Sequence, residues 1–197
     1  MPRPAIHDER SILAAASTLV AEGGPASATM AAISKVSGIG NGSLYHRFGS
    51  RDQILGRLWL DTATWFQDRF ERSLEGSDAR QAGLEAALSL PRGVRENLAG
   101  ARIMLLHRRD DFLSDGWPAD MKREAERLAA QVAHLLEQSS VRLFHSRSAA
   151  ARRATVFALL DIPFSGVHRH VAAGKAPPQE LDELIATAYH AVIDKGA

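Results

Sequence analysis

The sequence predicts an all-α protein built from a small N-terminal helical domain and a larger helical domain. Along most of the chain, apolar residues recur three and four positions apart, as they do on one face of a helix. No stretch alternates apolar and polar residues in the way that a half-buried strand does. Glycine and proline also divide the chain into pieces of helical length. We place the two domains at residues 1–50 and 51–197.

The composition is that of an ordinary globular protein. Of its 197 residues, 45% are hydrophobic and 24% are charged. The chain has no cysteine, which excludes disulfides and thiolate metal sites. We expect no membrane span, because no apolar run approaches about 18 residues, and the N-terminus lacks the apolar core of a signal peptide. These features favour a cytoplasmic protein.

The formal charge of the chain is only +1, and it is unevenly distributed. Residues 1–51 hold five basic and three acidic residues, which leaves this segment at +2. Such a faint basic bias is far from that of a protein that binds nucleic acid through bulk charge. Any contact with nucleic acid would therefore depend on the placement of a few side chains.

The first expected helix covers residues 8–22, where Ile12, Ala16 and Val20 share one face. Glycines and a proline at residues 23–25 end it. A second helix starts after Thr29, whose hydroxyl is placed to cap free backbone amides.

Gly38 ends the second helix, because glycine suits the left-handed residue that closes a helix. A third helix begins near Gly40, with Leu44 and Phe48 four residues apart and directed inward. Apolar anchors on one side and polar, aromatic and cationic groups on the other fit a recognition helix in the major groove. The outward or flanking side chains are Asn41, Ser43, Tyr45, His46 and Arg47.

Serine and proline positions set the remaining helix boundaries. Ser50 is expected to cap a long helix that runs to about Leu74. Pro91 and Pro118 suit the first turn of a helix, where the missing N–H costs no bond, whereas Pro163 inside a helix should kink it. The other helices are expected over residues 79–89, 91–105, 118–144, 149–173 and 178–194, with a connection at 145–148.

The segment from Thr29 to Ser50 resembles the tetracycline-repressor-like (TetR) family of bacterial transcription regulators. The shared positions are Thr29, Ile33-Ser34, Gly38-Ile39, the run from Gly42 to Phe48, and Ser50-Arg51-Asp52 with Ile54-Leu55 at the start of the long helix. Gly40 stands where the family often has a serine cap, which predicts a weaker cap here. Val36 and Ser37 also depart from the usual pair before the turn. The resemblance implies an all-α fold of roughly nine helices.

The resemblance also implies binding to a pseudo-palindromic operator in double-stranded DNA. Hydroxyl, phenol and cationic groups would contact phosphates, Asn41 and Ser43 would face base edges, and two glycines would let the backbone approach closely. The plain alternative is a corner between two helices with no role in DNA binding. The expected interface comprises Thr29, Lys35, Gly40, Asn41, Gly42, Ser43, Tyr45, His46, Arg47 and Arg51.

An effector pocket in the larger domain is a further expectation from the resemblance. Core packing explains each candidate residue taken singly. Asp161 is more specific, because a carboxylate within the apolar run LLDIPF needs a partner if it is buried. That partner is a ligand, an arginine across a dimer interface, or the backbone freed by Pro163. The candidate ligand residues are Trp59, Thr62, Phe66, Met104, Phe157, Asp161 and Phe164.

Other chemistries find little support in the sequence. The glycines at 38–42 do not form a nucleotide loop, since no strand precedes them and their spacing fails at Ser43. The eight histidines form none of the helical metal-binding motifs. No set of catalytic residues is present, so we expect neither an enzyme nor a bound metal or cofactor.

The sequence therefore predicts a dimeric DNA-binding transcription regulator, a repressor that a small-molecule effector releases from its operator. The homodimer would form through the last two helices, using the faces that carry Val156, Leu160, Leu181, Leu184 and Ala188. Two alternatives stay open. One is a helical small-molecule-binding or catalytic protein whose helix-turn-helix no longer works. The other is a DNA-binding dimer without an effector.

Overall fold

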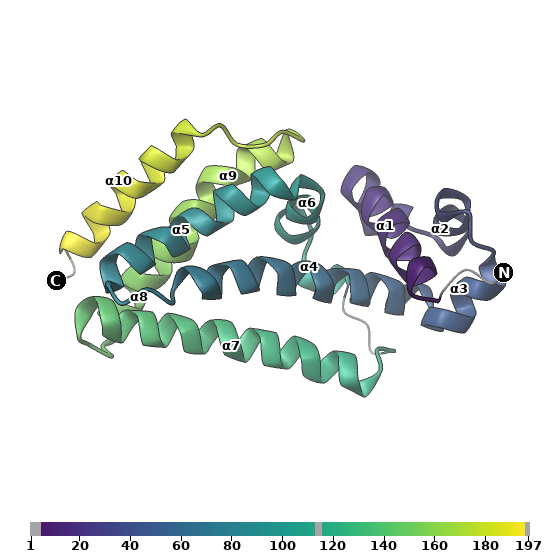
Figure 1. Ribbon diagram of the computed structural model, residues 1–197, viewed down its shortest axis with the longest axis horizontal. Helices are drawn as coiled ribbons and strands as arrows, with labels where there is room; N and C mark the ends of the chain where they lie inside the picture. The colour runs from purple at the N-terminus through teal and green to yellow at the C-terminus, as the bar shows by residue number, and fades with distance from the viewer. Residues whose placement is uncertain (1–4, 113–115, 196–197) are drawn as a thin grey trace. The chain divides into compact units, whose positions relative to one another are not determined.

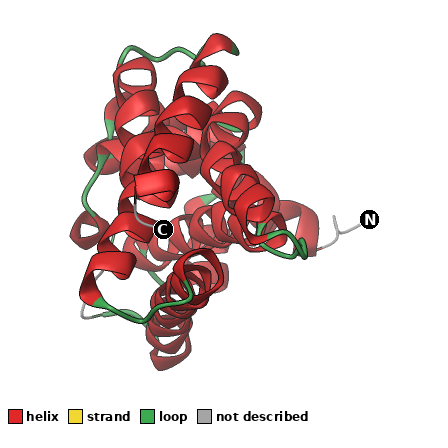
Figure 2. Cartoon of the chain, turned by 90° about the vertical axis from the view of Figure 1, so that its left-hand side faces the viewer, coloured by secondary structure: helices red, strands yellow, loops and turns green. Residues whose placement is uncertain are grey.

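The protein is described here by a computed structural model that covers residues 5–112 and 116–195. Within these ranges it contains helices, turns and loops but no strand, which confirms the predicted all-α fold (Figures 1 and 2). No described helix combines the length and hydropathy that a membrane span requires. The α-helices are α1 (Ala5–Gly23), α2 (Met30–Ser37), α3 (Asn41–Phe48), α4 (Arg51–Ser73), α5 (Ala79–Glu96), α6 (Leu98–Leu106), α7 (Ala119–Phe144), α8 (Ala149–Val156), α9 (Ile162–Ala172) and α10 (Glu180–Lys195).

The chain divides into two compact units. The smaller unit takes the residues up to Ala63 together with Ala99–Ala125, and the larger takes Thr64–Leu98 and the residues from Glu126 onward. Helices α4 and α7 each contribute to both units. The unit that contains the helix-turn-helix thus also includes the first half of α4, and a domain boundary at residue 50 stays a prediction.

Local capping forms the helix-turn-helix as the sequence predicts. The hydroxyl oxygen of Thr29 accepts a hydrogen bond from the amide of Ala32 at 3.1 Å, which caps α2. Gly38 closes α2 in the left-handed conformation, with φ of 71°. Gly40 provides no side-chain cap for α3, in agreement with the weaker cap expected there.

The core of the smaller unit is made by one buried face from each of its first helices. Ile12 on α1, Ile33 on α2 and Leu44 on α3 are completely buried. The start of α4 joins this core through Ile54, and Ser50 caps that helix by accepting from the amide of Gln53 at 3.2 Å. The core thereby fixes the orientation of α3, which has only two turns and no side-chain cap of its own.

In the larger unit, α5 packs against α9 and α10 (Figure 1). Tyr189 on α10 is fully buried, and its hydroxyl donates to the carbonyl of Arg80 at 2.9 Å. Arg95 on α5 holds both carboxylate oxygens of Asp182 on α10, at 3.0 and 2.7 Å. Two-point contacts of this kind fix the register between neighbouring helices.

Pro91 does not open a helix, contrary to the expectation from sequence. It is buried inside α5, which continues to Glu96, and the next helix begins at Leu98. A proline within a helix removes one backbone hydrogen bond, but the face of α5 that carries Ala87 and Val94 is fully buried. Tertiary packing therefore keeps the helix continuous until Asn97, where the backbone leaves the helical region.

The interruption expected near Pro163 takes the form of a π-helical turn over Phe157–Asp161, between α8 and α9. The amide of Ile162 donates to the carbonyl of Phe157, five residues back. Such widened turns accommodate a break in the regular hydrogen-bond pattern. Residues 149–172 thus remain one helical path despite the proline.

Candidate functional site

Helix α3 presents a polar face to solvent while Leu44 anchors it in the core. The side chains of Asn41, Ser43 and His46 are exposed, and that of Tyr45 is 54% exposed. Leu44 is completely buried. This arrangement leaves the amide, hydroxyl, phenol and imidazole groups available to an outside partner on one short helix.

The glycines at the start of α3 border open space. A Cβ atom built on Gly40 or on Gly42 has no neighbouring atom within 4 Å. Neither residue has the positive φ that requires glycine, so the protein's own packing does not explain why they lack side chains. Space kept free at the end of a surface helix suits close approach of a partner to the backbone.

Helix α2 adds further groups of the same unit. Thr29 Oγ1 already accepts from Ala32, but its hydroxyl hydrogen can still be donated to an external acceptor. Lys35 is exposed in the last turn of α2. Val36 is a large hydrophobic side chain that remains 52% exposed beside it, and sequence reasoning did not assign it to the interface.

Arg51, expected from the sequence to contact a phosphate, makes several contacts within the protein. Its guanidinium donates to two backbone carbonyls, those of Ala28 at 2.9 Å and Pro25 at 2.5 Å, and lies 3.5 Å from the carboxylate of Asp52. These contacts join the start of α4 to the loop before α2. Arg51 thus stabilises the helix-turn-helix. Arg47, at the end of α3, is half-buried.

The residues predicted to bind an effector divide between the two units. Trp59 and Thr62 are buried in the smaller unit, where the hydroxyl of Thr62 donates to the carbonyl of Leu58 at 2.7 Å. Met104 is half-buried in the same unit. In the larger unit, Phe66 is half-buried and meets the ring of Trp65 edge to face, with centroids 4.9 Å apart.

The remaining three candidates, Phe157, Asp161 and Phe164, are exposed in the larger unit. Asp161 was expected to need a partner because its sequence neighbours are apolar. Its exposed position removes that requirement, since a carboxylate in water has no desolvation cost to offset. The helical path turns Ala158 and Leu159 into the core and leaves Asp161 outside.

The two phenylalanines are exposed hydrophobic side chains of the π-helical turn and α9, two elements that also contact α10. Phe157 is 50% exposed, Phe164 is 42% exposed and Leu184 on α10 is 66% exposed. Leu181, which the sequence assigned to a pairing face, is buried beside Gly166 on α9. Large hydrophobic side chains left exposed on neighbouring elements are typical of surfaces that bind another protein.

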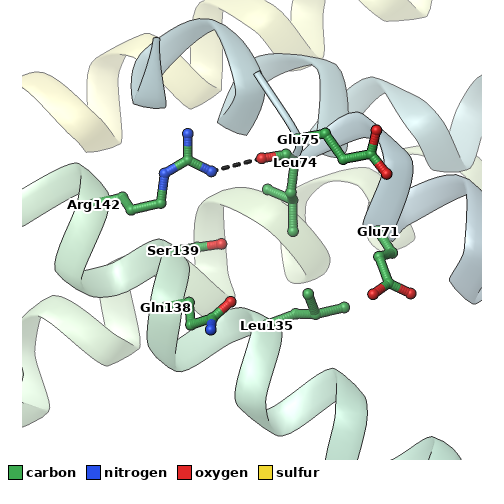
Figure 3. Close-up of a pocket in the computed structure, with 7 residues that line it drawn as sticks. All are labelled: Glu71, Leu74, Glu75, Leu135, Gln138, Ser139 and Arg142. Atoms are coloured by element: carbon green, nitrogen blue, oxygen red, sulfur yellow. Dashed lines mark hydrogen bonds between the residues drawn. The ribbon is translucent and has the colours of Figure 1, made fainter. Parts of the chain in front are cut away.

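One hollow of about 220 Å³ lies in the larger unit, near the end of α4 (Figure 3). Arg142 points toward Leu74 and donates to its carbonyl at 2.6 Å, and it also donates to the carbonyl of Gly76. Glu71 accepts from the side-chain amide of Gln131 at 2.6 Å. The polar groups of this hollow are largely engaged with the protein itself. Its lining residues are Glu71, Leu74, Glu75, Leu135, Gln138, Ser139 and Arg142.

No metal site gathers in the part of the chain that the structure describes, as no three His, Asp or Glu side chains come together there. The features that stand out are therefore the polar face of α3 and the apolar surface of the larger unit. The first exposes hydrogen-bonding groups of the kind that can read base edges, and the second exposes apolar side chains of the kind that protein contacts bury.

Comparison with known protein families supports the first of these features. Residues 12–58 match the family model of bacterial regulatory proteins of the tetR family. The matched segment includes α2, α3 and the first turns of α4. Comparison with curated protein sequences gave no match.

Solved structures share the fold of nearly the whole chain. The transcriptional regulator FadR from Bacillus subtilis, solved with stearoyl-CoA, has a TM-score of 0.70 at 16% identity, covering 95% of this chain and 98% of FadR. PfmR, a TetR family transcriptional regulator from Thermus thermophilus, has a TM-score of 0.68 at 23% identity, covering 94% and 95%. AibR, solved with isovaleryl coenzyme A and operator DNA, has a TM-score of 0.69 at 16% identity, covering 92% and 95%.

Proposed function

We propose that this chain, a TetR-family transcription regulator by its helix-turn-helix and its fold, binds a pseudo-palindromic operator as a homodimer and leaves it when a small-molecule effector binds. The observation that carries the proposal is the exposed polar face of α3, held on a buried anchor within the segment that matches the family. Regulators of this family are DNA-binding proteins and not enzymes.

In this proposal α3 enters the major groove of the operator. Asn41 and Ser43, near the start of the helix, read base edges, because an asparagine amide can pair with both N6 and N7 of adenine. Tyr45, His46 and the hydroxyl of Thr29 contact phosphates, which position the helix without reading sequence. The free space beside Gly42 lets the helix backbone come close to the DNA.

Dimerisation supplies the second recognition helix. A single short helix offers too little contact for tight, specific binding, whereas a two-fold dimer places one copy in each half-site. The exposed surface with Phe157, Phe164 and Leu184 supports this part of the proposal, since burial of large apolar side chains drives association. Half-sites would then lie about 34–36 Å apart on one face of the DNA.

Effector control is the third part of the proposal. Helix α4 contributes to both compact units, so a ligand that favours one position of α4 in the larger unit also acts on the smaller unit. Two regulators of similar fold were solved with acyl-CoA molecules. Acyl thioesters of CoA are therefore the first effectors to test, in place of the cations that a buried Asp161 would have selected.

The test is binding of the purified protein to the DNA that flanks its own gene, measured by fluorescence anisotropy against a shuffled duplex of equal length. We expect the native sequence to bind much more tightly, by a factor of about 10³ or more, and the affinity to fall steeply with salt. Equal affinity for both duplexes would contradict the proposal and favour a helical protein with a non-functional helix-turn-helix.

A second step tests the effector. Acyl-CoA molecules of short and long chain length are titrated into the protein–operator complex, with the matching free fatty acids as controls. Release by the thioesters supports effector control. Retention of the complex with every compound would favour a dimer that is regulated only by its abundance.

A further inference from the structure

A second hollow in the larger unit is lined by three arginines, two serines and one glutamate. It has a volume of about 380 Å³ and lies between the last turns of α4 and the second half of α5. This volume falls within the range of about 300–1,000 Å³ that small-molecule sites occupy. Three guanidiniums and one carboxylate give the lining a formal charge of +2. The lining residues are Arg69, Arg72, Ser73, Glu85, Ser89 and Arg92.

One arginine on α4, Arg72, has unused capacity to bind an anion. Arg72 is exposed and forms no ion pair within the described chain. Arg69 pairs with Glu96 at 2.5 Å, yet its Nε atom is buried without a hydrogen-bond acceptor. A buried donor that lacks an acceptor is costly and uncommon in folded proteins, but this nitrogen has almost no surface that a ligand in the hollow could reach, so the free capacity is that of Arg72.

The surrounding carboxylates cancel only part of this charge. Glu85 is engaged by Arg92 at 2.6 Å. Arg95 binds both carboxylate oxygens of Asp182. The Nε atom of Arg92 lies farther from this carboxylate, at 3.8 Å. With Glu96 included, three carboxylates face four guanidiniums, so the positive charge that remains is that of Arg72.

One of these cationic groups is also held in place. The guanidinium of Arg69 lies 4.7 Å from the ring centroid of Trp65, which restrains its plane. A planar guanidinium that is already oriented binds two phosphate oxygens at a lower entropic cost than a mobile ammonium group.

The serines indicate which kind of phosphate fits. The hydroxyl of Ser73 donates to the carbonyl of Arg69 at 2.8 Å, and that of Ser89 donates to Ala86 at 2.7 Å. Their oxygens consequently remain free to accept hydrogen bonds. A ligand with hydroxyl or amino donors beside its phosphates satisfies both the serines and the arginines.

We propose that this hollow binds the phosphate groups of a small organic phosphate of the nucleotide type, either a free nucleotide or the nucleotide end of a coenzyme. Only the consequence of binding rests on the proposed function, namely that the bound phosphates would act on α4. Binding itself involves residues of the larger unit alone.

Isothermal titration calorimetry on the full-length protein, without DNA, tests the site. Coenzyme A, ADP, pyrophosphate and inorganic phosphate are titrated into the wild type, Arg72→Gln and Arg72→Lys. We expect ADP and coenzyme A to bind more tightly than inorganic phosphate. Arg72→Gln should weaken binding by about ten- to a hundredfold, as loss of a charge-assisted hydrogen bond does, and Arg72→Lys should weaken it less.

Arg127→Gln is the matched control, because Arg127 is also an exposed helical arginine of the larger unit. It should bind like the wild type. Tighter binding of coenzyme A than of ADP would assign the site to a coenzyme. Equal affinity for the two compounds would assign it to nucleotides in general. Absence of binding by all four compounds, or equal affinity of the wild type and Arg72→Gln, would overturn the proposal. A protein that binds its operator but none of these phosphates would refute this site and leave the proposed function intact.

Discussion

The Nε atom of Arg51 donates a hydrogen bond to the carbonyl oxygen of Ala28 at 2.9 Å, which fastens the start of α4 to the residue just before the N-cap of α2. We predict that Arg51→Gln lowers the stability of the protein by about 1–3 kcal/mol, since it removes hydrogen bonds to a charged group. Thermal denaturation followed by circular dichroism measures this loss. The salt dependence of DNA binding by the folded variant should match the wild type. An unchanged melting temperature would instead identify a phosphate contact if the slope of the logarithm of the binding constant against the logarithm of the salt concentration fell by about one.

Asn41→Ala tests whether α3 reads sequence. Loss of a bidentate contact to a base should weaken operator binding by about 1–3 kcal/mol and relax the preference at one base pair. Tyr45→Phe is the comparison variant, because loss of a phosphate contact should weaken binding to all duplexes alike. Anisotropy measurements on a set of single-base operator variants separate the two patterns. Wild-type affinity and preference in both variants would exclude α3 as the reading helix.

Gly42→Ala tests the open space beside the start of α3. Nothing in the protein lies within 4 Å of the added Cβ atom, and alanine favours a helix by up to about 1 kcal/mol over glycine. The variant should therefore be as stable as the wild type or more so, while its affinity for the operator falls. A melting curve and a binding curve on the same preparation give both values. Unaltered affinity would mean that the DNA does not approach this residue.

Leu184→Asp tests the dimer. A carboxylate on the exposed apolar surface should prevent its burial between two copies, so that multi-angle light scattering finds monomers without specific operator binding. Ala133→Asp, at an exposed position of α7, is the control and should remain dimeric. If Leu184→Asp forms the same dimer as the wild type, the interface lies elsewhere.

The buried hydroxyl of Tyr189 leads us to predict that the folded protein loses stability at high pH. Burial raises the pKa of its hydroxyl to about 12 from an ordinary value of 10.0, with a smaller contribution from Asp78 and an opposing one from Arg80. Because the folded-state pKa is the higher one, the stabilisation is complete below pH 10 and is lost as the pH rises toward 12. Since the chain has two tyrosines, absorbance of tyrosinate in the Tyr45→Phe variant reports Tyr189 alone. Ionisation near pH 10 in the folded protein would contradict this prediction.

The local signals of the sequence predicted the helix-turn-helix well. A threonine before an apolar pattern and a glycine after it define the two ends of α2, and both caps are present. The interactions involved span three or four residues, so neighbouring residues determine them without help from the rest of the fold. The same holds for Ser50 at the start of α4.

Long-range packing decided the points at which sequence reasoning was wrong. Pro91 resembles the first residue of a helix, but burial of α5 on both sides of it outweighs one lost hydrogen bond. Asp161 is surrounded by apolar residues in sequence, yet the helical path leaves it exposed. Neighbours in sequence are not neighbours on a helix surface, where residues three and four apart lie together.

The sequence by itself determined the all-α class, the helix-turn-helix and the polar face of α3, because each of these depends on periodicity and caps within a short window. Only the tertiary structure decided that Arg51 binds backbone carbonyls and that Arg69 and Arg72 line a hollow with Arg92. A long flexible cation has many acceptors within reach of its backbone position. Which of them it meets depends on helices that lie apart in the sequence and come together only on folding.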